Sequence, residues 1–187
     1  MMIRLLQMVR GSRFARDRRG VSAVEFALLS PVMIGLYLGC NEVSQAINID
    51  RKVTLTAGTT ANLAAQVSSI TSTDMTNIMN ASQAILAPYS TSPLKITLSC
   101  LSIDANKKVT VKWSQAQNAT PRAVGSSVTI PGGLLVASTQ LLYSEVSYTY
   151  TPTIGYVITG PLNLSDTMFM SPRISAPSYP DSTHPCS

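Results

Sequence analysis

The chain has few charged residues and few of the side chains that enzymes and metal sites use. Only 12% of its 187 residues are charged, and it holds one histidine and three cysteines. His184 stands in a proline-rich tail, and one histidine cannot build the usual kind of zinc site. The carboxylates of Asp104, Glu145 and Asp166 show no pairing along the sequence. We therefore expect no catalytic residues, no metal site and no cofactor, and thus no enzyme.

Excess positive charge is absent from most of the chain. The net charge of +5 comes from the first 20 residues, which hold six arginines and one aspartate. The remaining residues hold eight basic and eight acidic side chains. Because a nucleic-acid-binding domain needs basic residues on its folded part, we expect no nucleic acid as a partner.

A long apolar run, Val21 to Cys40, follows the arginines directly. As a helix its twenty residues measure about 30 Å, the thickness of the hydrocarbon core of a bilayer. Arginines before such a span predict a cytoplasmic N-terminus and a chain that lies across the membrane after Cys40. A cleaved secretory signal is the alternative, but the run is longer than its apolar region and no small-x-small cleavage site stands out. A mitochondrial transit peptide would not normally run straight into a span.

Three features interrupt the apolar run. Glu25 carries the one charge of the run. Placing that charge in a bilayer costs on the order of 3 kcal/mol, so its presence there needs an explanation. Pro31 removes a backbone hydrogen bond and bends the axis, which membrane helices tolerate. Gly35 and Gly39 are four residues apart, a spacing that lets another helix approach closely.

Two helices are predicted from the period of the apolar residues. Helical spacing continues past the run, so we predict one long helix over Val21–Val67 that is amphipathic in its second half. A second helix is predicted after a Ser/Thr-rich turn, with Thr73 as its N-cap and Pro88 at its end. Its apolar face would hold Met75 and Ile78, among others.

Strands are predicted from Leu94 onward, where the period changes to two. Leu94–Cys100 and Lys108–Trp113 predict a hairpin with one buried face, followed by a loop over Gln115–Gly125. Further strands are predicted at Ser127–Ile130, Leu141–Thr151 and Leu162–Met170. The fold class is α+β, with an antiparallel sheet on the polar half of the long helix. The expected organisation is a leader at 1–20, a span at 21–40 and a head at 41–187.

The three cysteines differ in their expected surroundings. Cys40 ends the span and behaves as a small apolar residue. Cys100 is predicted to face the core, and Cys186 lies in the tail, both beyond the membrane where disulfides form. A bridge between these two would stabilise the fold by about 4 kcal/mol in the chain-entropy model. The alternative is that Cys100 and Cys186 are both free thiols.

The motif Arg18-Arg19-Gly20, followed by Val21-Ser-Ala-Val-Glu25-Phe26, resembles the processing site of type IV prepilins. The longer stretch from Gly20 to Pro31 resembles the TadE-type pseudopilins of tight-adherence (Flp) pili. Glu145–Pro152 and Met170–Arg173 are similar to the closing strand and basic tail of that family. Major Flp pilins are very short and have tyrosine after the glutamate. Phe26 on this longer chain therefore argues for a minor subunit.

The resemblance implies a role for each residue of the motif. A prepilin peptidase would cut after Gly20, leaving a charged amine on Val21 and placing Glu25 fifth in the mature chain. In a bundle of parallel helices, Glu25 can pair with the Val21 amine of a neighbour and fix their register. The same resemblance implies Phe26 and Pro31 as part of the assembling helix.

The implied partners are that peptidase, other pilins and pseudopilins, the inner-membrane assembly platform and the lipid bilayer. The implied place is the bacterial inner membrane, with a periplasmic C-terminal domain. Without the motif, the chain reads as an unprocessed single-pass anchor that carries a binding module.

Overall fold

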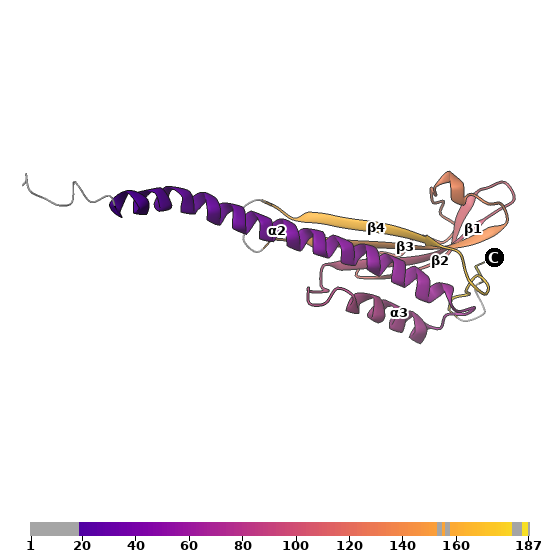
Figure 1. Cartoon of the computed structure of the whole chain (residues 1–187). Coiled ribbons are helices and arrows are strands. Elements are labelled where there is room, and N and C mark those ends of the chain that lie inside the picture. Colours follow the sequence, from indigo (N-terminus) through magenta and orange to yellow (C-terminus); the bar gives the residue numbers. More distant parts are fainter. Residues whose placement is uncertain (1–18, 153–154, 156–157, 181–184, 187) are drawn as a thin grey trace, which may run out of the picture.

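The computed structural model describes residues 19–152, 155, 158–180 and 185–186 (Figure 1). Most of the predicted leader, including Arg18, and also His184 lie outside the described residues. The described part consists of a long helix, a second helix and a four-stranded antiparallel sheet. The predicted α+β class is therefore confirmed.

The long helix, α2, spans Arg19–Ala65 and extends far beyond the sheet at its N-terminal end (Figure 1). Its bounds agree with the prediction to within two residues at each end. The backbone N–H of Arg173 donates to the carbonyl of Ala65 at 2.9 Å. That bond satisfies one of the carbonyls that every helix leaves free at its C-terminus.

The second helix, α3, spans Ser72–Ala84, and its N-cap is Thr71. The prediction of Thr73 as the cap was wrong. The Thr71 hydroxyl accepts from the Asp74 N–H at 3.1 Å, and the Asp74 carboxylate accepts from the Thr71 N–H at 3.0 Å. This reciprocal capping box requires a spacing of three residues, which Thr71 has to Asp74 and Thr73 does not. The helix also ends four residues before Pro88.

The sheet has the order β2-β1-β3-β4, with every neighbouring pair antiparallel. Its strands are β1 (Leu94–Ile103), β2 (Val109–Gln117), β3 (Thr139–Tyr150) and β4 (Leu162–Met170). The predicted hairpin is confirmed as β1 and β2. The loop predicted from Gln115 was wrong at its start, because β2 continues to Gln117. The strand predicted at Ser127–Ile130 was wrong too, since that segment makes a single bridge, from Ser127 to Thr110. A short 3₁₀ helix, η3 (Gly132–Leu134), follows it.

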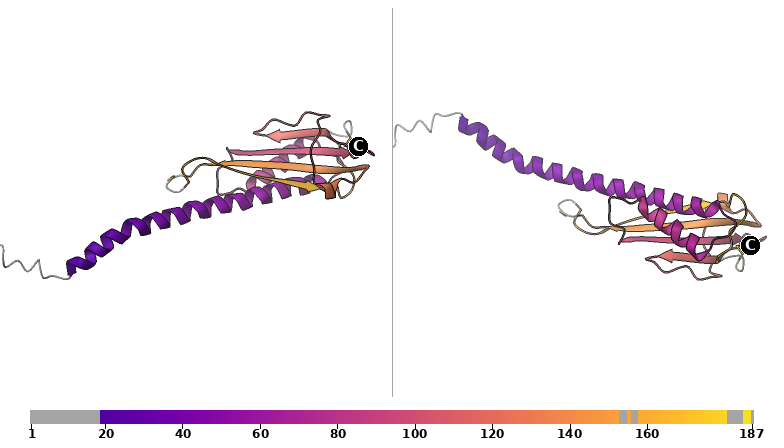
Figure 2. Two further views of the ribbon diagram at one scale, coloured as in Figure 1. Left: turned by 90° about the horizontal axis from the view of Figure 1, so that it is seen from above. Right: turned by 90° about the horizontal axis from the view of Figure 1, so that it is seen from below.

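Both helices pack on one face of the sheet (Figure 2). The larger core lies between these layers. It combines small residues of α2, such as Ala57 and Ala64, with large ones from the strands, such as Leu98 and Leu142. Val146, Tyr148 and Tyr150 share this face, as their alternation predicts. The predicted packing of the sheet on the second half of the long helix is confirmed.

A second core lies on the opposite face of the sheet, so the prediction of one buried face was wrong. Its buried members are Leu101, Ile103, Val109, Val111, Val128, Ile130, Leu141 and Tyr143. The register of β1 with β2 shifts between Cys100 and Leu101, so that Cys100 pairs with Trp113 but Leu101 pairs with Val111. This irregularity breaks the alternation in β2. Trp113 therefore joins the helix-side core while Val111 joins the other.

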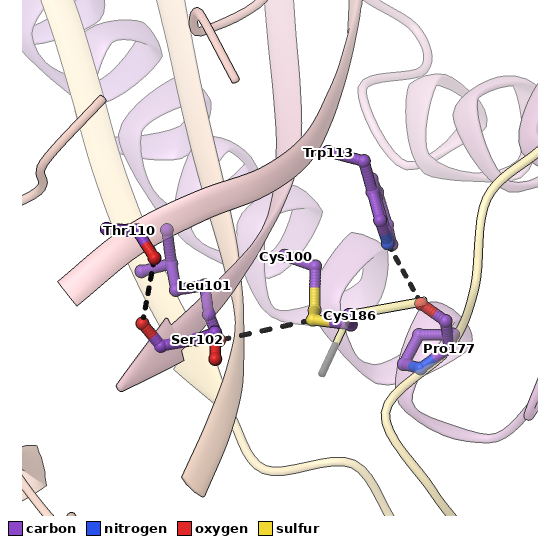
Figure 3. Close-up of a disulfide and its surroundings, with 7 residues drawn as sticks. All are labelled: Cys100, Leu101, Ser102, Thr110, Trp113, Pro177 and Cys186. Atoms are coloured by element: carbon purple, nitrogen blue, oxygen red, sulfur yellow. Dashed lines mark hydrogen bonds between the residues drawn. A yellow bond between two sulfur atoms is a disulfide. The ribbon is translucent and has the colours of Figure 1, made fainter. Parts of the chain in front are cut away.

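The C-terminal tail is tied to the end of the sheet and to α2. The indole N–H of Trp113 donates to the carbonyl of Pro177 at 2.9 Å (Figure 3). Ser178 makes a parallel bridge with Ser69, just after α2. Cys100, fully buried in the core as predicted, forms a disulfide with Cys186 (Figure 3). The tail thus closes the end of the core at which α2 terminates.

Candidate assembly and membrane interface

The N-terminal half of α2 exposes an almost unbroken apolar surface. Its large exposed side chains are Val21, Val24, Phe26, Leu28, Leu29, Val32, Met33, Ile34, Leu36 and Tyr37, each at least 56% exposed. Burying one such side chain is worth about 1.5–3 kcal/mol. Ten such side chains together must therefore be covered by another molecule. In the described part of the chain, α2 alone is long and apolar enough to cross a membrane.

The predicted processing and assembly residues lie in the first turns of α2. Gly20, Val21, Glu25 and Phe26 are all exposed, and Phe26 is 68% exposed. Val21 and Glu25 are four residues apart and so lie on one face of the helix, one turn from each other. Both groups are therefore placed where another molecule can reach them.

Gly20 lies inside the first turn of α2, although a peptidase cleft would accept it in an extended form. A Cβ added at this glycine would meet nothing within 4 Å, and its φ is not positive. The described part of the chain therefore gives no reason for a glycine here. A glycine in a helix is less favourable than alanine by about 1 kcal/mol, so the residue is unexplained by the isolated chain.

Pro31 interrupts the hydrogen bonding of α2, and Ser30 compensates. Proline has no N–H to donate to the carbonyl of Ala27, four residues earlier. The Ser30 hydroxyl lies 3.4 Å from that carbonyl and donates to it. Replacement of a lost backbone donor by a serine is one of the ways in which membrane helices accommodate proline.

A shallow apolar groove of about 410 Å³ lies along the end of the apolar run. It is lined by Gly35, Leu36, Gly39, Cys40, Val43 and Ser44. The two glycines, which the sequence singles out by their spacing, form its floor with Cys40, which is an exposed free thiol. Small residues at one groove allow the backbone of a second helix to approach closely.

Glu42 is a buried carboxylate beside the span that the sequence did not predict to be buried. Its side chain is only 3% exposed, and a carboxylate oxygen accepts from the backbone N–H of Ile158 at 3.2 Å. The pKa of Tyr150 is raised, first by burial and next by the negative charge of Glu42. Helical spacing contained the signal, since Glu42, Ala46 and Ile49 follow the same buried face of α2.

A polar cavity of about 370 Å³ lies against the sheet, between the segment after β2 and the strands β1, β3 and β4. Arg122 binds both carboxylate oxygens of Glu145, at 2.5 and 2.6 Å, and its guanidinium lies over the ring of Tyr143. The hydrogen bonds to Glu145 raise the pKa of Arg122, and burial raises the pKa of Tyr143. This ion pair holds the segment after β2 on the sheet. Among the described residues no group of His, Cys, Asp or Glu side chains could hold a metal ion.

Comparison with known proteins identifies the helix on which these features lie. The family model described as TadE-like protein matches residues 20–65. Residues 20–65 are thus similar to a TadE-like protein. The matched segment coincides almost completely with α2 and includes both its exposed and its packed half. The match confirms the resemblance seen in Gly20–Pro31. It suggests a role in a tight-adherence pilus system, with other pilus components as partners.

The TadE-like match does not reach the sheet. The similarity of Glu145–Pro152 and Met170–Arg173 to that family therefore stays a prediction, and Glu145 lies in the third strand of four. No curated protein and no solved structure matches the chain.

Proposed function

We propose that this protein is a minor pseudopilin that takes part in building a tight-adherence pilus. In this proposal a prepilin peptidase cuts after Gly20, and α2 then packs laterally against the helices of other pilins and pseudopilins in the inner membrane. One observation carries the proposal: a TadE-like helix whose first half presents ten large apolar side chains to its surroundings.

The unexplained glycine supports the cleavage step. Among the described residues nothing requires the missing side chain of Gly20, so we take the requirement to come from another molecule. A peptidase cleft that admits no side chain at this position is such a requirement. Arg18, Arg19 and Val21 complete the site of cleavage in this proposal.

The position of Glu25 supports the packing step. Its carboxylate is exposed on α2, yet the apolar surface around it belongs in lipid, where an isolated charge is costly. The new amine on Val21 of a neighbouring subunit would neutralise it, and the pairing fixes the axial register between helices. Phe26 and Pro31 lie on the same exposed half of the helix.

The proposed orientation of the chain in the membrane follows from the positive charge that precedes the span. The arginines before Gly20 stay in the cytoplasm, and residues 41–187 form a head on the periplasmic side. We propose a non-enzymatic role in which this head contacts other subunits. The assembly platform would then extract the mature subunit from the membrane.

An unprocessed signal-anchored protein with a periplasmic binding module is the second candidate. It is favoured by the same basic arm and span, and by the polar cavity beside Arg122 and Glu145. It gives no account of Gly20 or of Glu25.

Mass spectrometry of the protein extracted from membranes of pilus-forming cells distinguishes the two. We expect an N-terminus at Val21, with or without an added methyl group, and an uncut precursor in the variant Gly20→Leu. Ala23→Leu, which introduces the same side chain beyond the cut, is the control and should be processed. An N-terminus at Met1 or Met2 in the unmodified protein contradicts the proposal and favours the anchor.

A further inference from the structure

We propose that the head rests directly on the bilayer, through the end of the sheet at which β3 finishes and β4 begins. This inference rests on the proposed function only in that α2 must cross the membrane. The partner is the headgroup region of a phospholipid bilayer, beside the point where α2 leaves it.

No linker separates the head from the span. Gly39 and Glu42 are the first buried residues of α2, and the predicted span ends between them at Cys40. With a rise of 1.5 Å per residue, Glu42 lies about 3 Å beyond the end of the apolar run. Headgroups extend roughly 5–8 Å beyond the hydrocarbon on each side, so the first contact between head and helix falls within them.

Ile158 and the paired ends of β3 and β4 lie at that contact. The N–H of Ile158 donates to the Glu42 carboxylate, and Tyr150 at the end of β3 pairs with Leu162 at the start of β4. Figure 1 shows that this end of the two strands points along α2 toward its N-terminal half. Ile158 and Leu162 are thereby placed beside the end of the span.

The composition of this end suits an interface with lipid. The sequence from Thr151 to Ser165 contains no charged residue. Ile158 is half-buried and Leu162 is 38% exposed.

The opposite end of the sheet differs in charge. There the turn between β1 and β2 holds Asp104, Lys107 and Lys108, all exposed. This difference fits a head that sits on a bilayer with the end of β3 and the start of β4 on the lipid and the turn between β1 and β2 in water.

Three tryptophan variants of the full chain test the inference. Leu162→Trp reports on the proposed contact, Val136→Trp on the far end of the head, and Leu29→Trp on the span. Val136 and Leu29 are exposed apolar residues at 56% and 60%. The native Trp113 is 3% exposed and gives a common background. Each variant is reconstituted in phosphatidylcholine vesicles with and without acyl chains brominated either near the headgroup or near the bilayer centre, and the loss of emission is compared with that of the unmodified protein.

We expect bromine to reduce the added emission of Leu162→Trp and Leu29→Trp and to leave that of Val136→Trp unchanged. If Leu29→Trp is quenched while Leu162→Trp behaves like Val136→Trp, α2 crosses the membrane but the head does not contact the bilayer, and the inference is refuted. If Leu29→Trp is not quenched, the span itself is refuted and both proposals fall.

Discussion

The two halves of α2 are continuous in backbone but opposite in surroundings. The large apolar residues from Val21 to Tyr37 are 56–72% exposed, whereas Val53, Ala57, Ala61 and Ala64 are at most 1% exposed. In an ordinary globular protein the half with the larger apolar side chains would be the buried one. Here the exposed half is the more apolar.

The packed half compensates for its small residues with hydroxyl hydrogen bonds. Thr56 donates to the Lys52 carbonyl at 2.7 Å, and Thr60 donates to Ser82 of α3 at 2.8 Å. Alanine and threonine let the sheet and α3 approach the helix closely. The packed half is therefore suited to a close, fixed contact with the sheet and α3 of the same chain. The exposed half is suited to contact with lipid and with other helices.

The largest expected effect separates assembly from folding in the exposed half. We expect Glu25→Ala to abolish pili, because the Val21 amine of the neighbour loses its partner, while membrane insertion, cleavage and the unfolding free energy of the head stay unchanged. Electron microscopy of sheared filaments and immunoblots of membrane fractions measure these effects. Ser22→Ala, an exposed change in the same turn, is the control and should leave pili normal. Normal pili in Glu25→Ala would refute the pairing.

The next largest effect concerns the disulfide that ties the C-terminal tail to the core beside the packed half of α2. Cys100 and Cys186 are 86 residues apart, and a bridge over a loop of that length is worth about 4 kcal/mol. We expect Cys186→Ser to lower the unfolding free energy by about that amount in denaturant titrations. Cys40→Ser, a change in the exposed half, should leave it unchanged. Alkylation of both Cys100 and Cys186 in the native protein without reductant would show that the bridge does not form.

The third prediction compares substitutions of two isoleucines that lie two positions apart on α2. Ile49 is 1% exposed and Ile47 is 48% exposed. We expect Ile49→Ala to cost roughly 2–5 kcal/mol of unfolding free energy, because it leaves a cavity between α2 and the sheet. Ile47→Ala should cost about 0.5 kcal/mol or less. Equal losses in urea titrations would show that the face of the helix has been assigned wrongly.

Much of the fold was predictable because its patterns are local. The apolar period predicted the long helix and the second helix, and the alternation predicted all four strands, with the bounds of α2 within two residues. The buried Cys100 was predictable from its place in an alternating strand.

The remainder depends on contacts between segments distant in sequence. The irregularity between Cys100 and Leu101 moves Trp113 to the other face of the sheet, and no local pattern announces it. The second core forms only because Val128 and Ile130 fold back over the sheet. Glu42 was missed since a carboxylate after a span suggests water, whereas its partner, the N–H of Ile158, is 116 residues away.

The smallest expected effect depends on pH and acts only on the head. Hydrogen bonds from the side chain and backbone of Thr71 lower the pKa of Asp74 below its ordinary value of 3.8. A lowered pKa in the folded state means that the carboxylate stabilises the fold above pH 3.8 and that this contribution is lost as the pH falls through the folded value. Asp74→Asn keeps the side-chain acceptor but removes the charge. We expect the difference in unfolding midpoint between the two proteins to be small at neutral pH and to shrink well below pH 3.8. A difference that is the same at both pH values would mean that the charge at α3 contributes nothing, and that hydrogen bonding alone caps the helix.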